Sequence, residues 1–361
     1  MTAVLEKPTQ QLTPKEPRQW KGPAVFVAVA IIALVVMPLV LEPFRLGLLA
    51  KYLCYAIVAL GIGLAWGQGG MLTLGQGVFF GLGGYAMGMY LKLNDAGGDL
   101  PDFMVWSGVE DLPALWAPFG NPVFALAMVV VVPLVVAVLL GTLVFRQRVR
   151  GAYFAILTQA LAAAMVILLV GQQGLTGGTN GLTNFFDFFG NDVAAESTQR
   201  GLYLTVAIVL GVLYLAAWQL VRSRFGRLLL AVRDGEDRVR FLGYNPATVK
   251  TITFAISAVM AGIAGALFVP VVGIISPALL GVVPSLELVV AVAVGGRFAL
   301  AGAVLGAVVM GYAKTYFSEE LPDAWLYLQG ALFILVMTLA PKGIVGVATA
   351  LRARVRKEAS A

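Results

Sequence analysis

Residues 122–145 read PVFALAMVVVVPLVVAVLLGTLVF, a run that contains no charged side chain. As a helix that rises about 1.5 Å per residue, this run is roughly 36 Å long, enough to cross a hydrocarbon layer of about 30 Å. The whole chain has the same character, because 60% of its 361 residues are apolar, 12% are charged, and the mean hydropathy is +0.89. A water-soluble body of this size needs more polar side chains to cover it. The sequence therefore predicts an integral membrane protein.

Similar apolar runs recur along the chain and predict an all-α fold of about ten transmembrane helices. We expect spans at Ala24–Leu41, Leu46–Leu64, Met71–Leu91, Pro122–Phe145, Gly151–Val170, Gly201–Val221, Thr251–Pro270, Ser285–Gly296, Phe298–Ala313 and Ala324–Ala340. Between the seventh and eighth spans, three prolines at positions 270, 277 and 284 predict a connecting segment that can re-enter the membrane.

The basic residues predict the orientation. Most of the 25 Lys and Arg residues face the cytoplasm if both chain ends lie there, as the positive-inside rule requires. The predicted units are a cytoplasmic tail at 1–23, a transmembrane domain at 24–340, an extracytoplasmic acidic insertion at 92–121, an extracytoplasmic loop at 171–200, a cytoplasmic loop at 222–250 and a basic cytoplasmic tail at 341–361. The basic residues behind the net charge of +6 are explained by their placement on the cytoplasmic side of the membrane. We therefore expect contact with membrane lipid and none with nucleic acid.

The chain offers little for catalysis. It has no histidine and one cysteine, Cys54, which excludes a disulfide and any His- or Cys-based metal site or dyad within one chain. The G-x-x-x-x-G-K-[ST] phosphate-binding loop is also missing from the sequence. We therefore expect no catalytic residues, no metal and no cofactor bound by this chain.

A glycine-rich segment from Gly67 to Gly88 follows the second predicted span. Glycine at this density lets helices approach closely or break, and a broken helix inside a membrane is tolerated only against protein or a water-filled path. Gln68, Thr73 and Gln76 stand in this segment, and buried amides need hydrogen-bond partners. We predict that these three side chains line a translocation path, although close packing explains the glycines equally well.

Two further features are candidates for contact with a solute. Glu287 is the one acidic residue inside a predicted span, where it is placed to carry a proton, bind a cation or touch a solute on the path. The alternative is a position at the outer interface, where water solvates it. The outer loop offers Thr176, Thr179 and Asn180 to a solute or a docking protein, although composition alone favours a plain turn-rich connector.

The loop at 222–250 predicts a short amphipathic helix. Asp234 is the expected N-cap, and Gly243, which precedes Asn245 and Pro246, supplies the stop. The same pattern is typical of a helix that meets anionic lipid and of one that docks a partner protein.

Several segments in order resemble the permeases of the branched-chain amino-acid and urea group of ABC importers, over about residues 51–346. The matching segments are Gly70–Gln76, Gly177–Thr183, Ser223–Arg227, Ala231–Asp234, Arg238–Pro246, Ala261–Leu267 and Val294–Arg297. Within this group the chain is most similar to the permease subunits of urea importers. That similarity is carried by Gly178–Thr183, Asp237–Pro246, Ser318–Pro322 and Leu328–Phe333.

The resemblance implies a multi-pass permease of the bacterial inner membrane. It implies a second homologous permease subunit, two cytoplasmic ATP-binding subunits that hold ATP and magnesium, and a periplasmic solute-binding protein. It also makes the loop at 222–250 the segment that couples to an ATPase. The coupling residues would be Gly226, Arg227, Arg233, Asp234, Asp237, Arg238 and Gly243. The acidic insertion at 92–121 is long for this family, and its role is open.

The resulting expectation is the transmembrane subunit of an ATP-driven, binding-protein-dependent importer of a small neutral solute, first of all urea. A branched-chain amino acid or a short amide carried by the same machine is the first alternative. A proton-coupled secondary carrier or channel that uses Glu287 is the second, and dependence on ATP separates it from the others. A membrane enzyme is disfavoured, because no clustered nucleophile, base or metal set is present.

Overall fold

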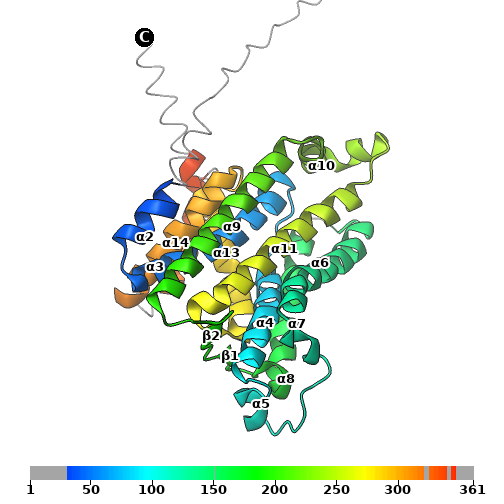
Figure 1. Cartoon of the computed structure of the whole chain (residues 1–361). Helices are drawn as coiled ribbons and strands as arrows, with labels where there is room; N and C mark the ends of the chain where they lie inside the picture. Colours follow the sequence, from blue (N-terminus) through cyan, green and yellow to red (C-terminus); the bar gives the residue numbers. More distant parts are fainter. Residues whose placement is uncertain (1–30, 150, 321–324, 340–342, 347–361) are drawn as a thin grey trace, which may run out of the picture.

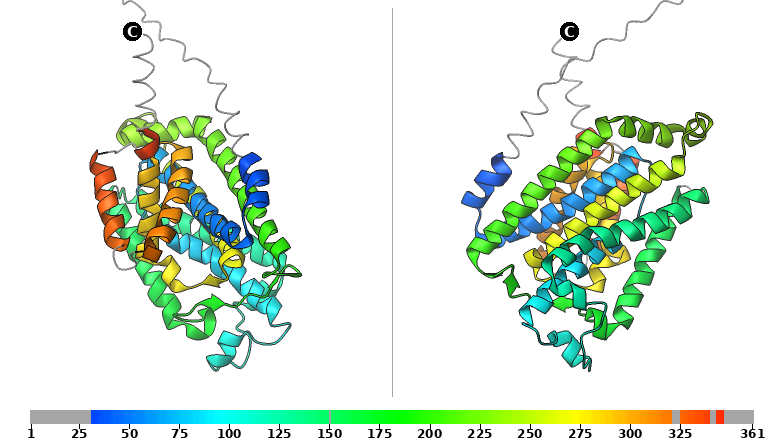
Figure 2. Two further views of the ribbon diagram at one scale, coloured as in Figure 1. Left: turned by 90° about the vertical axis from the view of Figure 1, so that its left-hand side faces the viewer. Right: turned by 45° about the vertical axis from the view of Figure 1, so that its right-hand side comes forward.

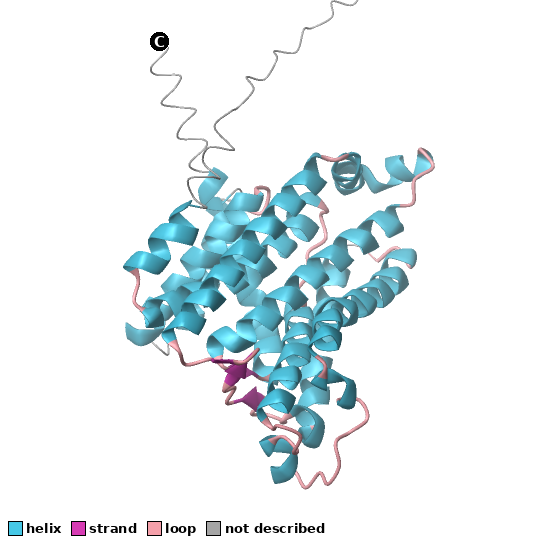
Figure 3. Cartoon of the chain, viewed as in Figure 1, coloured by secondary structure: helices cyan, strands magenta, loops and turns pink. Residues whose placement is uncertain are grey.

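The structure is a computed structural model, and it describes residues 31–149, 151–320, 325–339 and 343–346. Helices dominate it (Figures 1 and 3). In chain order the elements are a π-helical turn Ile32–Val36, α2 Met37–Val40, α3 Pro43–Ile62 with a π-helical continuation Gly63–Gln68, α4 Gln76–Asp95, α5 Asp102–Trp106, a 3-10 turn Ala117–Gly120, α6 Pro122–Arg146, α7 Ala152–Gly171, α8 Gln173–Thr176, β1 Leu182–Thr183, β2 Asp187–Phe188, β3 Asn191–Asp192, α9 Glu196–Arg222, α10 Arg224–Phe241, α11 Pro246–Val272, β4 Ile274–Ile275, α12 Pro277–Leu280, α13 Val282–Gly295, α14 Leu300–Glu320 and α15 Trp325–Leu339.

Six helical segments in the described part of the chain are long and apolar enough to cross a membrane. They are Pro43–Gln68, Pro122–Arg146, Ala152–Gly171, Glu196–Arg222, Pro246–Val272 and Leu300–Ser318. α4 occupies a further predicted span, and α13 and α15 are shorter apolar helices at two more. The first predicted span and both tails lie wholly or partly outside the described residues. The total of about ten spans and the cytoplasmic placement of both chain ends therefore stay predictions.

The helices run between two ends of the molecule that differ in structure. At one end lies α10, and at the other lie α5, α8 and the short strands, as Figures 1 and 2 show. We refer to these as the α10 end and the strand end; they correspond to the predicted cytoplasmic and extracytoplasmic sides. The four strands form two antiparallel pairs, β1 with β4 and β2 with β3.

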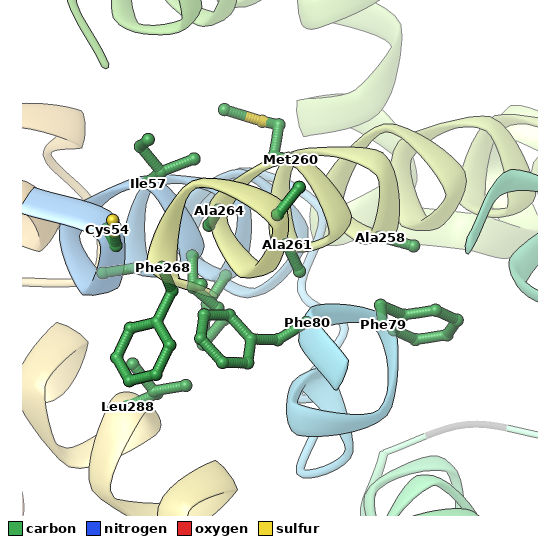
Figure 4. Close-up of a cluster of buried hydrophobic side chains, with 14 of the residues drawn as sticks. Cys54, Ile57, Phe79, Phe80, Ala258, Met260, Ala261, Ala264, Phe268 and Leu288 are labelled. Atoms are coloured by element: carbon green, nitrogen blue, oxygen red, sulfur yellow. The ribbon is translucent and has the colours of Figure 1, made fainter. Parts of the chain in front are cut away.

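The centre of the molecule is built where α11 packs along α3, α4 and α6. Phe80 of α4 and Phe268 of α11 meet edge to face with 5.1 Å between ring centroids, and Leu288 of α13 lies beside them (Figure 4). Glycine makes this approach possible, because a Cβ on Gly265 would lie 1.8 Å from the Phe80 carbonyl oxygen. The glycines of α4 pack in the same way, because a Cβ on Gly83 would lie 2.0 Å from the Gly262 carbonyl oxygen. Close packing of small residues, the second interpretation of the glycine-rich segment, therefore holds for this part of α4.

Two helix boundaries differ from the sequence-based expectation. The predicted span from Met71 begins instead at Gln76, because the chain from Gly69 to Gly75 is not helical and Gly70 has a φ of +71°. Pro270 does not end its helix but lies inside α11. The proline removes one backbone hydrogen bond, and α11 continues for two more residues beyond it.

Candidate functional site

The break before α4 places polar side chains deep in the protein. Thr73 is fully buried and Gln76 is 1% exposed. Gln76 Nε2 donates to Ser257 Oγ at 2.9 Å, and Ser257 lies eleven residues along α11 from Pro246. At about 1.5 Å per residue this is roughly 16 Å from the α10 end of that helix, near the middle of a bilayer.

Two oxygen atoms at this break have no hydrogen-bond donor among the described residues. They are Thr73 Oγ1 and Gln76 Oε1. One residue further on, Gly77 N donates to Ser285 Oγ at 3.1 Å, which joins the first turn of α4 to the first turn of α13. A buried acceptor without a donor is costly, so these two oxygen atoms are candidates for an interaction that the described residues do not supply.

The break is connected to α10 through Arg233. Arg233 Nη1 donates to the Gly67 carbonyl oxygen at 2.8 Å, and its Nε donates to Asp234 Oδ1 at 2.8 Å. The hydrogen bond from Arg233 lowers the pKa of Asp234 below its usual value. Beside this contact, Gln68 Nε2 donates to the Phe298 carbonyl oxygen at 3.0 Å. The α10 residue Arg233 is thus attached directly to the start of the break, a link that no local sequence pattern signals.

The coupling helix begins earlier than the sequence suggests. α10 starts at Arg224, with Ser223 Oγ accepting from Gly226 N at 3.3 Å, so Ser223 and not Asp234 is the N-cap. The chain bends at Gly235, which has non-helical dihedral angles, and Asp234 lies just before this bend. The expected N-cap at Asp234 is therefore wrong for the start of α10. The signal missed is the serine two residues after the α9 apolar run.

Packing fixes α10 on the rest of the protein. Leu229, Val232 and Val239 form a buried cluster with Val249 of α11. Gly226 is required where α9 turns into α10, because a Cβ there would lie 2.1 Å from the Val221 carbonyl oxygen.

The polar face of α10 holds the remaining predicted coupling residues. Arg227 and Arg238 are exposed and make no hydrogen bond or ion pair with the described part of the chain, while Asp237 Oδ1 accepts from Arg240 Nη1 at 3.1 Å. Gly243 follows the helix with a φ of +86°, which confirms the predicted stop. Phe241 beside it is 92% exposed, so an apolar side chain stands among these charges.

Glu236 is a contributor that the sequence analysis missed. Its carboxylate pairs with Arg240 on α10 and with Lys250 on α11, so it ties the second half of α10 to the transmembrane core. Its side chain is 11% exposed.

Glu287 is paired and is not a lone carboxylate. Lys314 Nζ of α14 donates to both of its oxygens, at 2.8 and 2.6 Å. The Glu287 side chain is 19% exposed. The structure places it towards the strand end, apart from the Gln68–Gln76 break but on the helix whose Ser285 contacts that break.

The three outer-loop candidates differ in their surroundings. Thr176 is buried, and its hydroxyl donates to the carbonyl oxygens of Leu169 and Gln172 near the end of α7. Thr179 and Asn180 are exposed. The loop is held in place by β1, whose pairing with β4 joins it to the α11–α12 connection.

The acidic insertion packs against this same loop. Lys92 is 5% exposed, and its Nζ donates to Asp102 at 3.0 Å and to the Asn184 carbonyl oxygen at 3.2 Å. Trp116 Nε1 donates to the Leu175 carbonyl oxygen at 2.9 Å, and Asp95 accepts from two backbone N–H groups of the outer loop. The insertion and the outer loop therefore form one connected surface at the strand end.

A large apolar groove and the arrangement of acidic side chains indicate which ligands the described residues are suited to bind. A groove of about 700 Å³ between α6, α9 and α11 has mostly apolar walls, which suit hydrocarbon better than a polar solute. Within the described residues, no group of three or more acidic, histidine or cysteine side chains is arranged to hold a metal ion.

The described residues form a helical membrane protein with a packed surface helix at one end and buried polar groups at a helix break. Residues 44–337 match the family described as branched-chain amino acid transport system / permease component, and the chain belongs to this family. The chain is 27% identical to the high-affinity branched-chain amino acid transport system permease protein LivM of Salmonella typhimurium, over 89% of this chain and 74% of that protein. It is 28% identical to the permease protein LivH of Escherichia coli, over 81% of this chain and 91% of LivH.

A third relative carries a different name. The ribose import permease protein RbsC of Haemophilus influenzae is 24% identical over 71% of this chain and 80% of that protein. No solved structure matches the chain significantly. The relatives are permease subunits, so this chain is a transport protein and not an enzyme.

Proposed function

We propose that this chain is the permease subunit of an ATP-driven, binding-protein-dependent importer in the bacterial inner membrane, and that its cargo is urea. The observation that carries the cargo is the pair of buried acceptors without donors, Thr73 Oγ1 and Gln76 Oε1. Urea presents N–H donors in several directions and carries no charge that the membrane interior would penalise. The resemblance of several sequence segments to urea-importer permeases supports the same cargo.

The relatives do not fix the cargo. Two are named for branched-chain amino acids and one for ribose, at identities between 24% and 28%. Proteins at this distance keep the fold and the transport mechanism while the residues around the solute change.

A branched-chain amino acid is the second candidate, and the names of LivM and LivH favour it. Glu287 and Lys314 provide opposite charges for a zwitterion. The secondary-carrier alternative is weakened, because the carboxylate it needs forms an ion pair with Lys314 at 2.6 Å and is not a lone charge.

The proposed machine has partners on both sides of the membrane. Permeases of this family work with ATP-binding subunits and a periplasmic binding protein. We assign to this system a second homologous permease and two ATPase subunits that hold ATP and magnesium. The exposed Arg227, Arg238 and Phe241 of α10 face the ATPase, and the exposed Thr179 and Asn180 face the binding protein.

Coupling follows from the connection of α10 to the helix break. ATP binding and hydrolysis in the ATPase move α10, and the Arg233–Gly67 hydrogen bond passes this movement to the segment that leads to Thr73 and Gln76. Arg238→Asp reverses a charge that makes no hydrogen bond or ion pair within the described chain. It is expected to abolish uptake and to leave membrane insertion intact, since it removes only a contact to the partner.

The deciding experiment measures uptake of labelled urea and labelled leucine by cells with and without this gene, after ATP depletion and after collapse of the proton gradient. Gene-dependent urea uptake that fails without ATP but survives the uncoupler supports the proposal. Leucine uptake with the same pattern replaces the cargo and keeps the mechanism. Uptake that fails with the uncoupler while ATP is maintained refutes the ATP-driven mechanism.

A further inference from the structure

A small pocket lies among α3, α13, α14 and α15, with Phe80 of α4 in its wall. Phe80 and Leu288, both wall residues, are drawn in Figure 4 where α4 and α13 approach each other. Pro284 also lines the pocket, and its neighbour Ser285 accepts from Gly77 N. One wall of the pocket, α13, is therefore hydrogen-bonded to the first turn of α4, which follows the helix break.

The polar wall of this pocket contains a paired but unsaturated carboxylate. Glu287 accepts two hydrogen bonds from Lys314, and an ionised carboxylate has about four acceptor positions. Lys51 of α3 lies close enough to interact electrostatically with both side chains. Glu287 is formally negative and both lysines are formally positive, and the carboxylate has two acceptor positions beyond those that Lys314 uses.

Gln329 of α15 supplies a second polar group. It is 7% exposed, lines the pocket, and makes no hydrogen bond with any described residue. Its polar atoms are not among the fully enclosed unpaired atoms of the described residues, so they are accessible from the pocket that Gln329 lines. Both the carbonyl and the amino group of Gln329 are therefore free to bind a molecule in the pocket.

The size of the pocket limits what that molecule is. Its volume is about 50 Å³. This volume is far below the roughly 300–1,000 Å³ of pockets that take drug-sized ligands, so the pocket favours a solute smaller than leucine, which has about nine non-hydrogen atoms. Urea and acetamide each have about four non-hydrogen atoms.

We propose that this pocket is a binding site for a small neutral amide of the size of urea. Two N–H groups of the amide donate side by side to Glu287, in the way that a guanidinium meets a carboxylate, and Gln329 bonds the remaining polar edge. The apolar side chains of Leu288 and Met310 close the other walls and exclude larger solutes. This inference rests on the proposed function and names the residues that select the cargo.

The test changes the size of the pocket and measures selectivity. Met310 is 6% exposed, and Met310→Ala removes part of its wall. The complete transporter, with this variant permease, is reconstituted in proteoliposomes and supplied with labelled urea and labelled N-methylurea. We expect the ratio of N-methylurea to urea uptake to rise at least fivefold. Met89→Ala is the matched control, because Met89 is fully buried in α4 and does not line the pocket.

A second variant tests the polar contact. Gln329→Leu keeps the approximate volume and removes both hydrogen-bonding groups, so the KM for urea is expected to rise about tenfold while maximal ATP hydrolysis stays near the wild-type rate. In the Met310→Ala test, the ratio of N-methylurea to urea uptake is measured within one preparation, so the yield of folded protein does not affect that ratio.

The outcomes separate the pocket from the cargo. If the wild-type transporter imports urea and neither Met310→Ala nor Gln329→Leu changes selectivity or KM, the pocket assignment is overturned and the proposed function stands. If the wild-type transporter imports leucine and no small amide, both are overturned.

Discussion

Arg233→Met is expected to uncouple transport from ATP hydrolysis. In the structure, Arg233 is the residue of α10 that donates to the Gly67 carbonyl oxygen, at 2.8 Å, at the start of the helix break. Methionine keeps an apolar stem of similar length, so the packing of the side chain changes little while the guanidinium is lost. The substitution therefore removes the connection and leaves both α10 and the break in place.

The size of the effect follows from the kind of hydrogen bond. A bond from a charged donor contributes about 1.5–3 kcal/mol, and we take the lower value because solvent reaches the side chain. Its exposure is 27%. A loss of about 1.5 kcal/mol changes the equilibrium between attached and detached α10 by roughly tenfold. Uptake per ATP hydrolysed is expected to fall by about that factor.

The assay measures uptake and ATP hydrolysis in the same proteoliposomes that contain the complete transporter. Arg224→Met is the matched control, because Arg224 is exposed on the same helix and makes no hydrogen bond or ion pair with the described residues. It is expected to keep the wild-type ratio. If Arg233→Met also keeps the wild-type ratio of uptake to hydrolysis, the proposed route from α10 to the break is refuted.

Three further predictions follow from the packing and the charges. Gly67→Ala places a Cβ 1.7 Å from the Arg297 carbonyl oxygen and is expected to lower the thermal unfolding temperature in detergent strongly, whereas Gly47→Ala, which meets nothing within 4 Å, should leave it unchanged or slightly raise it. Lys92→Met leaves the α5 carboxylate without its cation, so amide hydrogen exchange across residues 96–121 should become faster while exchange in α6 stays the same; unchanged exchange in the insertion would contradict this role. The lowered pKa of Asp234 means that its ion pair is present above an ordinary aspartate pKa of about 3.9 and is lost only as the pH falls through the lower folded value. Uptake per ATP hydrolysed should therefore be constant from about pH 8 to about pH 5. A decline over this range that disappears in Asp234→Asn would refute this prediction.

The sequence by itself determines that this is a helical membrane protein. Long apolar runs such as residues 122–145 are unfavourable in contact with water and predict a membrane-spanning helix. The structure has this helix as α6, Pro122–Arg146. Motifs along the chain also indicate the permease family, which the match over residues 44–337 confirms. These properties can be predicted because they depend on local hydrophobicity and on short segments whose residues are adjacent in the chain.

The start of α4 and the start of α10 are local features that the sequence left ambiguous. Glycines at 69, 70 and 75 are compatible with a tightly packed helix and with a break, and Ser223 competes with Asp234 as an N-cap. Neighbouring helices decide between these possibilities. A Cβ on Gly75, for example, would lie 2.2 Å from the Thr158 carbonyl oxygen of α7. Helix propensity is a local property and does not predict this contact between two helices.

Only the tertiary structure decides which polar groups meet. Arg233 reaches Gly67 across 166 residues of sequence, and Gln76 reaches Ser257 across 181. Glu287 is identifiable from the sequence as a charge inside a span, but its partner Lys314 lies on the next helix. The physical reason is that hydrophobic patterns specify which segments are buried in the membrane, whereas the pairing of their polar side chains depends on how the helices are rotated and packed against one another.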